Sequence, residues 1–262
     1  MSAIVLEQDI VHYEVLGRGR PIVFLHDWLG SWRYWIPCMQ TASTSFRAYA
    51  IDLWGFGDTA HDERRYTLDA QVALVDDFFQ QLGIGKVALV GHGLGALVAM
   101  LYALRYPGSV DRLMAVGFPM DENHLSPRLR TAPLPELADW LLAHTPTAET
   151  VRQDAGKTDP RAIQASLTDL SRFGALKATA QVTNACLLVH GQNDLLVETP
   201  RPEELASLPE QTHQITLEIS GHFPMLDESA RFNRLLTDFL ALPSGDSPRN
   251  LQLKEEWKRR VR

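Results

Sequence analysis

The pentapeptide Gly91-His92-Gly93-Leu94-Gly95 is the segment of this chain whose spacing most directly indicates chemistry. It follows an apolar run that ends at Val90, and a helical pattern begins directly after it at Ala96. A glycine-framed turn between a strand and a helix is the G-x-S-x-G arrangement that presents a nucleophile. The central residue here is Gly93, which has no side chain that can attack. Covalent catalysis from this position is therefore not expected, although the outer glycines still let strand and helix approach closely.

The turn lies within a regular alternation of apolar runs and helical patterns. This alternation predicts a mostly parallel sheet with helices on both faces, and ligands of such a sheet bind at the carboxyl ends of its strands. A half-exposed antiparallel hairpin is predicted over residues 3–17. Strands are predicted at Pro21–Leu25, Ala48–Ile51, Lys86–Val90, Arg112–Val116, Ala185–Val189 and, more weakly, Ile215–Ile219. Helices are predicted at Ser31–Thr41, Leu68–Leu82, Ala96–Tyr106, Pro202–Leu208 and Glu228–Leu240.

The alternation stops over residues 121–180, where short helical patterns are separated by Pro, Thr and Gly. We expect this segment to form a helical cap over the strand ends, with residues 1–120 and 181–242 as the core. Residues 243–262 have the composition of a linker followed by a basic amphipathic helix with a narrow apolar stripe. This helix is expected to dock on the acidic body of the chain or on a partner.

Composition limits the classes of function. The chain has 262 residues, 45% of them hydrophobic and 22% charged, as in ordinary globular proteins. Its net charge of −7 gives no reason to expect nucleic-acid binding. No apolar stretch reaches the roughly 18 residues that span a bilayer, and no secretory signal is visible. Cys38 and Cys186 have no metal-ligand spacing and are expected to be buried free thiols of a cytoplasmic protein. No metal and no cofactor are expected.

Four motifs, in their order along the chain, resemble those of the α/β-hydrolase superfamily, in its capped form with an HGxxG motif. The resemblance covers residues 3–242. It implies an α/β-hydrolase fold, in which a mostly parallel twisted sheet of about eight strands has helices on both faces and a helical cap insertion. The motifs are His26–Gly30, Asp52–Thr59, Gly91–Gly95, and Gly191–Asp194 followed by Gly221–Phe223.

The resemblance also implies roles for individual residues. Asp194 corresponds to the acid and His222 to the base of a catalytic triad. The third member is missing, so that Gly93 is a vacant nucleophile position. The backbone N–H groups of Trp28 and Leu94 are implied to form the oxyanion hole.

Asp27 is a second departure from the family pattern, because it replaces the second glycine of the HG motif beside the expected oxyanion hole. An inward carboxylate there would oppose a developing oxyanion. We therefore expect its side chain to face solvent or to cap the following helix. Asp27, Phe118 and Phe223 are candidate contacts for a small apolar or ester-like molecule. His92 is expected to point into the structure and pack, and Asp121 to mark the start of the cap.

Three hypotheses for function remain open at this point. The protein is a non-covalent small-molecule binder, a hydrolase of ester-like molecules in which His222 activates a water held in the space at Gly93, or a serine hydrolase carrying a Ser-to-Gly replacement. Loss of a triad nucleophile removes on the order of 10⁶ in turnover, or about 8 kcal/mol. The third hypothesis predicts that Gly93→Ser restores ester turnover.

Overall fold

An eight-stranded sheet runs through the computed structural model, which describes residues 2–251. The strands lie in the order β1-β2-β4-β3-β5-β6-β7-β8. The first two form the predicted antiparallel hairpin, β2 is also antiparallel to β4, and the strands from β3 to β8 are parallel. Their bounds are β1 Ser2–Leu6, β2 Asp9–Gly17, β3 Arg20–Leu25, β4 Phe46–Ile51, β5 Val87–His92, β6 Val110–Val116, β7 Ala185–Gly191 and β8 Thr212–Leu217.

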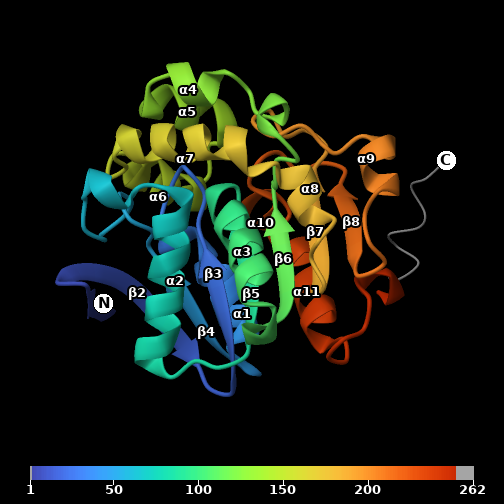
Figure 1. Ribbon diagram of the computed structural model, residues 1–262. Coiled ribbons are helices and arrows are strands. Elements are labelled where there is room, and N and C mark those ends of the chain that lie inside the picture. The colour runs from blue at the N-terminus through green and yellow to red at the C-terminus, as the bar shows by residue number, and fades with distance from the viewer. Residues whose placement is uncertain (1, 252–262) are drawn as a thin grey trace.

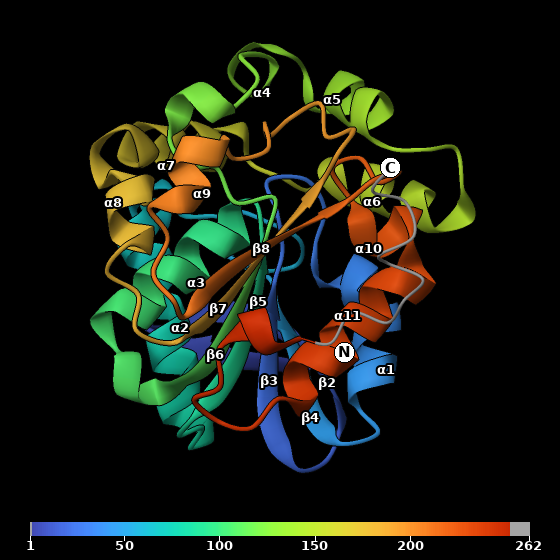
Figure 2. The ribbon, with the colours of Figure 1, turned by 90° about the vertical axis from the view of Figure 1, so that its right-hand side faces the viewer.

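Helices cover both faces of the sheet, as predicted. Figure 2 shows α1, α10 and α11 on one face and α2, α3 and α8 on the other. The predicted helix over Leu68–Leu82 is confirmed at both ends, because the Thr67 side chain caps its start and Gly83 ends it with a φ of 64°. The bounds are α1 Ile36–Ala42, α2 Leu68–Leu82, α3 Leu94–Arg105, α8 Ala175–Thr179, α9 Pro202–Ala206, α10 Pro224–Asp227 and α11 Ser229–Ala241.

The centre of the core is formed by β5 and α3, which are buried along nearly their whole length. Their sequences lack an amphipathic period because neighbours cover them on all sides. The edge strand β8 is less regular. It begins at Thr212, three residues before the predicted start, because its pairing with β7 sets its bounds, and Ile219 falls outside it.

A helical insertion, residues 122–179, connects β6 to β7 and lies over the end of the sheet toward which the parallel strands point (Figure 1). It is fastened to the loops that follow β3 and β4. Ser31 donates a hydrogen bond to Asp154 at 2.5 Å, and the Asp159 N–H donates to the Gly55 carbonyl at 2.9 Å. Its pieces are η4 Glu122–His124, α4 Arg128–Thr131, α5 Leu134–Leu141, α6 Pro146–Ala155, α7 Pro160–Phe173 and α8.

The described chain ends beside β8, where the short turn η5 (Pro248–Asn250) contacts β7 and β8. The predicted basic helix falls in residues 252–262, outside the described residues. Within residues 2–251, no helix has the length and apolar character needed to cross a membrane.

Candidate active site

The turn between β5 and α3 has the geometry of a nucleophile elbow. Gly93 adopts φ 49° and ψ −108°, a backbone conformation that residues other than glycine rarely adopt. A Cβ on Gly95 would collide with the Leu25 carbonyl, and one on Gly91 with the Gly95 carbonyl. The outer glycines are therefore needed for the close approach of β5, α3 and the end of β3, as the sequence indicated.

The space at Gly93 is not vacant, which corrects the sequence-based expectation. A Cβ built on Gly93 would overlap Oδ1 of Asp27 and lie 2.7 Å from its Cγ. The expectation that Asp27 faces solvent is also wrong, because its side chain is fully buried. The backbone N–H of Asp27 donates to the buried hydroxyl of Tyr34 at 2.8 Å. A carboxylate thus occupies the space that a side chain at position 93 would fill.

The Asp27 carboxylate is held by backbone donors and by one imidazole. Leu94 N–H points at Oδ1 from 3.4 Å and Leu29 N–H at Oδ2 from 3.3 Å, and the Trp28 N–H also bonds to the carboxylate. The two amides implied to form the oxyanion hole, those of Trp28 and Leu94, therefore both contact Asp27. Burial opposes ionisation, but the attraction and hydrogen bond of His222 outweigh it, so that the pKa of Asp27 is lowered.

His222 lies between two carboxylates. Its Nδ1 is 2.9 Å from Oδ2 of Asp194, and its Nε2 is 3.1 Å from Oδ2 of Asp27. Because carboxylates only accept hydrogen bonds, both ring nitrogens must carry protons. Burial disfavours the charged ring, but Asp194 and Asp27 outweigh burial and raise the pKa of His222 to about 10. His222 is therefore an imidazolium ion at neutral pH, and its Nε2 is a proton donor.

Asp194 is positioned by the loop that follows β7. Its Oδ1 accepts hydrogen bonds from the N–H groups of Leu196 at 2.8 Å and Val197 at 3.0 Å, which leaves Oδ2 for His222. Burial raises the pKa of Asp194, but the charge of His222 outweighs it and the net shift is downward. The buried unit Asp27–His222–Asp194 thus contains two carboxylates and one imidazolium, with one net negative charge.

His92 is buried beside this unit, as expected, and contacts the backbone of His222. Its Nε2 lies 2.8 Å from the His222 carbonyl, and its Nδ1 lies 3.1 Å from the Tyr34 hydroxyl. The carbonyl can only accept, so His92 carries its proton on Nε2 and the Tyr34 hydroxyl donates to Nδ1. Burial, followed by the charge on His222, lowers the pKa of His92 to about 4. His92 is neutral and fixes the backbone at His222.

The aromatic side chains of Phe223 and Trp28 pack beside the unit. Phe223 packs edge-on against His222, with ring centroids 5.1 Å apart, while Phe118 is buried and its carbonyl lies 3.0 Å from Nε2 of His190. The Trp28 ring lies against the elbow, and its Nε1 donates to Ser166 on α7 at 2.9 Å. The helical insertion therefore holds in place the indole that covers the carboxylate. The predicted roles of Phe118 and Phe223 in ligand contact remain predictions.

Two residues of this site, Tyr34 and Ser166, escaped sequence reasoning. Tyr34 lies in the predicted helix over 31–41 and Ser166 in a predicted helix of the insertion, and no local pattern distinguishes either from a packing residue. Their contacts with Asp27 and Trp28 exist only after distant segments of the chain meet.

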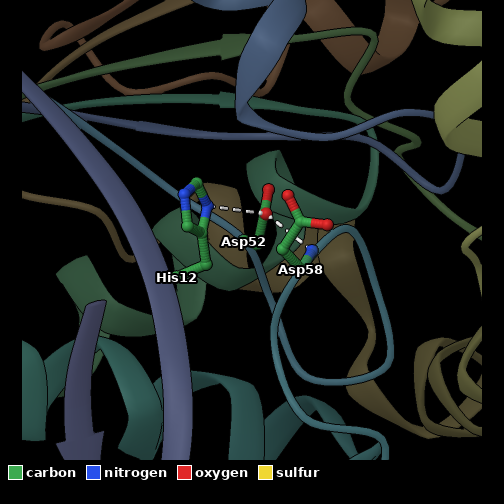
Figure 3. Close-up of side chains that lie close together, drawn as sticks. All are labelled: His12, Asp52 and Asp58. Carbon is green, nitrogen blue, oxygen red and sulfur yellow. Dashed lines mark hydrogen bonds and ion pairs between the residues drawn. The ribbon is translucent and has the colours of Figure 1, made fainter. Parts of the chain in front are cut away.

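His12, Asp52 and Asp58 form a separate cluster whose ligand atoms lie within 4.8 Å of one another (Figure 3). Oδ2 of Asp52 is 3.1 Å from Nδ1 of His12 and accepts from the Asp58 N–H at 3.0 Å. The Asp58 carboxylate pairs with Arg33 at 3.1 Å and with Lys157 at 2.6 Å. A metal ion would face these two positive charges, so we assign the cluster to anchoring the loop after β4.

A comparable group joins the insertion to α9. The ring nitrogens of buried His124 each lie 3.1 Å from a carboxylate, Nδ1 from Asp121 and Nε2 from Glu204. Asp121 also caps η4 through the N–H of Asn123. Since both ring nitrogens are engaged, the group fastens the start of the insertion, the position expected for Asp121.

Comparison with known proteins agrees with this architecture. Residues 20–150 match the family model described as the alpha/beta hydrolase fold. The chain belongs to the α/β-hydrolase superfamily. The predicted eight-stranded, mostly parallel sheet flanked by helices is thereby confirmed.

Curated proteins similar to this chain include several with hydrolase names. The putative carbamate hydrolase RutD of Yersinia enterocolitica is 25% identical over 272 residues, which cover 94% of this chain and 97% of that protein. RutD of an Escherichia coli strain is 29% identical, over 84% of this chain and 91% of that protein. Epoxide hydrolase 4 of Mus musculus is 34% identical over 113 residues, which span 41% of this chain but only 31% of that longer protein.

Solved structures share the fold at low identity. The enol-lactonase of Burkholderia xenovorans LB400 has a TM-score of 0.80 at 18% identity, covering 92% of this chain and 100% of that one. An esterase of Exiguobacterium antarcticum has a TM-score of 0.81 at 18% identity, covering 92% and 99%.

Proposed function

We propose that this α/β-hydrolase-fold protein is a hydrolase of small uncharged molecules that acts through the Asp27–His222–Asp194 unit instead of an elbow side chain. One observation carries the proposal. Nε2 of His222 faces, at 3.1 Å, a carboxylate that occupies the space of a nucleophile at position 93, while its Nδ1 is held 2.9 Å from Asp194. A reacting oxygen, an imidazole and an orienting acid thus stand in the order that nucleophilic catalysis needs.

The same geometry argues against two hypotheses left open by the sequence. A water at Gly93 activated by His222 requires space that Asp27 fills and a lone pair on Nε2 that is protonated. A simple Ser-to-Gly replacement leaves unexplained why Asp27 fits only when residue 93 has no side chain. Gly93 and Asp27, the two departures from the family pattern, are complementary, because the carboxylate fits only beside a glycine. This favours a site in which Asp27 replaces the elbow side chain over a site that has only lost it.

The names of the relatives support hydrolysis of small molecules. They include a putative carbamate hydrolase, an epoxide hydrolase, an enol-lactonase and an esterase. These names denote hydrolysis of a carbamate, an epoxide, an enol-lactone and an ester. We therefore propose substrates with ester-like or strained cyclic carbon–oxygen bonds.

A substrate panel tests the proposal. Short-chain p-nitrophenyl esters, γ-lactones, carbamates and small epoxides are assayed with the wild type, His222→Gln, Asp194→Asn and the exposed-site control His61→Gln. We expect turnover of at least one class, a loss of about 10²-fold or more in the first two variants, and no loss in the control. Absence of turnover in all four classes, or full activity of a folded His222→Gln variant, would overturn the proposal.

A separate observation favours the binder hypothesis as a second candidate. A pocket of about 520 Å³ lies where α4 and α7 meet the loop after β7, a volume typical of small-molecule sites. A ligand from a thermal-shift screen should lose its stabilising effect in Ser126→Trp, because Ser126 is a half-buried residue of the lining and a larger side chain there reduces the pocket. An unchanged shift would place the ligand elsewhere. The pocket is lined by Glu122, Asn123, Leu125, Ser126, Pro127, Leu129, Arg130, Leu167, Leu195, Leu196 and Glu198.

A further inference from the structure

We propose that the pocket between α4, α7 and the loop after β7 binds a small primary amine with an aliphatic body, and that Glu198 is the counter-ion of its ammonium group. This inference rests on the second candidate function, to which it adds the class of ligand and the residue that recognises it. It is independent of the hydrolysis proposed for the buried Asp27–His222–Asp194 unit. The apolar part of the lining, its charges and the backbone that holds its walls carry the inference.

The buried part of the lining is apolar. It consists of Leu129 of α4, Leu167 of α7 and Leu196 of the loop after β7. The two helices contact each other over the carboxyl ends of the strands (Figure 1). Leu195 also lines the pocket, and its side chain is 54% exposed. A ligand with an aliphatic body would remove this leucine from water, which favours binding.

The ionisable residues of the lining are two carboxylates and one guanidinium, so that its net charge is −1. The guanidinium of Arg130 is already engaged, because its Nη2 lies 3.5 Å from Oε2 of Glu122 and 3.4 Å from the Leu167 carbonyl. The carboxylate of Glu198 makes no hydrogen bond and no ion pair within residues 2–251. The pocket therefore offers one acceptor group that carries a full charge and has no partner.

The chemistry of this lining selects the class of ligand. A carboxylate only accepts hydrogen bonds, and a primary ammonium group supplies three donors and the opposite charge. A quaternary ammonium group has no donor and is usually bound by aromatic faces, whereas the lining of this pocket contains no aromatic side chain. An anionic ligand would meet the net negative charge, with Arg130 already paired to Glu122. A primary amine on an aliphatic chain satisfies both the carboxylate and the leucines.

Backbone contacts join the two walls of the pocket. The N–H of Glu198 donates to the His124 carbonyl at 2.8 Å, and Leu125 forms an antiparallel bridge with Val197. The start of the insertion and the loop after β7 are thus held against each other, with Glu198 at a fixed place in the chain. A site whose backbone is already in place loses little free energy to ordering when a ligand binds.

Isothermal titration calorimetry with three probes of equal chain length tests the inference. Hexylamine, hexanol and hexanoate are titrated at pH 7, where an alkylamine is protonated, into the wild type, Glu198→Gln and Glu203→Gln. Glu203 is an exposed carboxylate of α9 outside the lining, so its variant controls for the loss of one charge. We expect hexylamine to bind about tenfold more tightly than hexanol, and Glu198→Gln to lose about tenfold in affinity for hexylamine, because hydrogen bonds between charged groups are stronger than neutral ones. Glu203→Gln should bind hexylamine as the wild type does.

Amide NMR shows where the probe binds. Hexylamine should shift the amide signals of Leu195 and Leu196, which line the pocket, and leave those of Gln80 and Gln81 at the far end of α2 unchanged. Shifts that spare Leu195 and Leu196 would overturn the inference.

The remaining outcomes separate this inference from the functions proposed above. No binding of hexylamine, equal binding of hexanol or hexanoate, or equal losses in the two glutamate variants overturns the inference. If a ligand from the thermal-shift screen still depends on the pocket in Ser126→Trp, the second candidate function stands without it. If no ligand depends on the pocket, the second candidate function fails and the inference with it. The substrate panel decides on hydrolysis separately.

Discussion

A side chain at position 93 is the most informative perturbation of this protein. Gly93→Ala adds one methyl group at a φ of 49° and directly onto Oδ1 of Asp27. The variant tests whether the buried carboxylate occupies the elbow. In an empty elbow, a methyl group would reduce stability only through the unfavourable backbone conformation of residue 93.

Two contributions set the expected loss of stability. The backbone conformation costs a residue other than glycine on the order of 1 to 3 kcal/mol. Displacement of Asp27 also breaks its hydrogen bond to His222, and hydrogen bonds to charged groups contribute about 1.5 to 3 kcal/mol. The sum is about 2.5 to 6 kcal/mol, which corresponds to a fall in Tm of the order of 10 °C for a chain of this size.

Urea unfolding followed by circular dichroism measures this loss, and Gly83→Ala is the control for a methyl group at a positive φ. Gly83 has a φ of 64° and the ordinary left-handed ψ of 32°, and a Cβ there meets no atom within 4 Å. The control should cost only about 1 kcal/mol. If Gly93→Ala is no more destabilising than Gly83→Ala, Asp27 does not fill the elbow and the reasoning is refuted.

The same collision changes the prediction for a restored serine. Gly93→Ser alone should gain no ester turnover, because Asp27 occupies the space of the hydroxyl and pairs with His222. Asp27→Gly combined with Gly93→Ser removes the obstruction, so the double variant should gain turnover of p-nitrophenyl esters. It should also lose less free energy of unfolding than the sum of the two single variants. Equal activity of the single and the double variant would contradict the complementarity of the two positions.

The remaining predictions concern protonation and the cover of the site. The pKa of His222 is raised from 6.5 to about 10, so the stability that its ion pairs contribute is complete below about pH 6.5 and is lost as pH rises through 10. Conversely, the lowered pKa of Asp27 means that its contribution is present above about pH 4 and is lost on acidification. Nitrogen NMR should show both ring nitrogens of His222 protonated at pH 7, with a lower titration midpoint in Asp27→Asn; one bare nitrogen would be inconsistent with the ion pairs. Ser166→Ala should cost about 1 to 3 kcal/mol because it leaves the buried Nε1 of Trp28 without its acceptor, whereas Ser171→Ala, on the same helix but exposed, should cost little. Equal losses in the two serine variants would mean that the contact with Trp28 contributes nothing.

The sequence determined the fold and half of the site. Period-two and period-3.6 patterns and the glycine-framed turn were sufficient to place the strands and the helices, because these features depend on neighbours within a few turns of chain. The helix over Leu68–Leu82 and the buried strands were found for this reason. Asp194 and His222 were implied by the resemblance of their motifs to those of the α/β-hydrolase superfamily, and not by a local pattern.

The tertiary structure decided whether the Asp27 carboxylate is buried and which groups it contacts. Asp27 and His222 are 195 residues apart, and their contact depends on the pairing of β3 with β5 and on Trp28 held by Ser166 of the insertion. A local pattern shows only that position 27 carries a carboxylate. Whether that group faces water or lies buried against an imidazolium is set by long-range packing, since burial and charge partners come from segments distant in sequence.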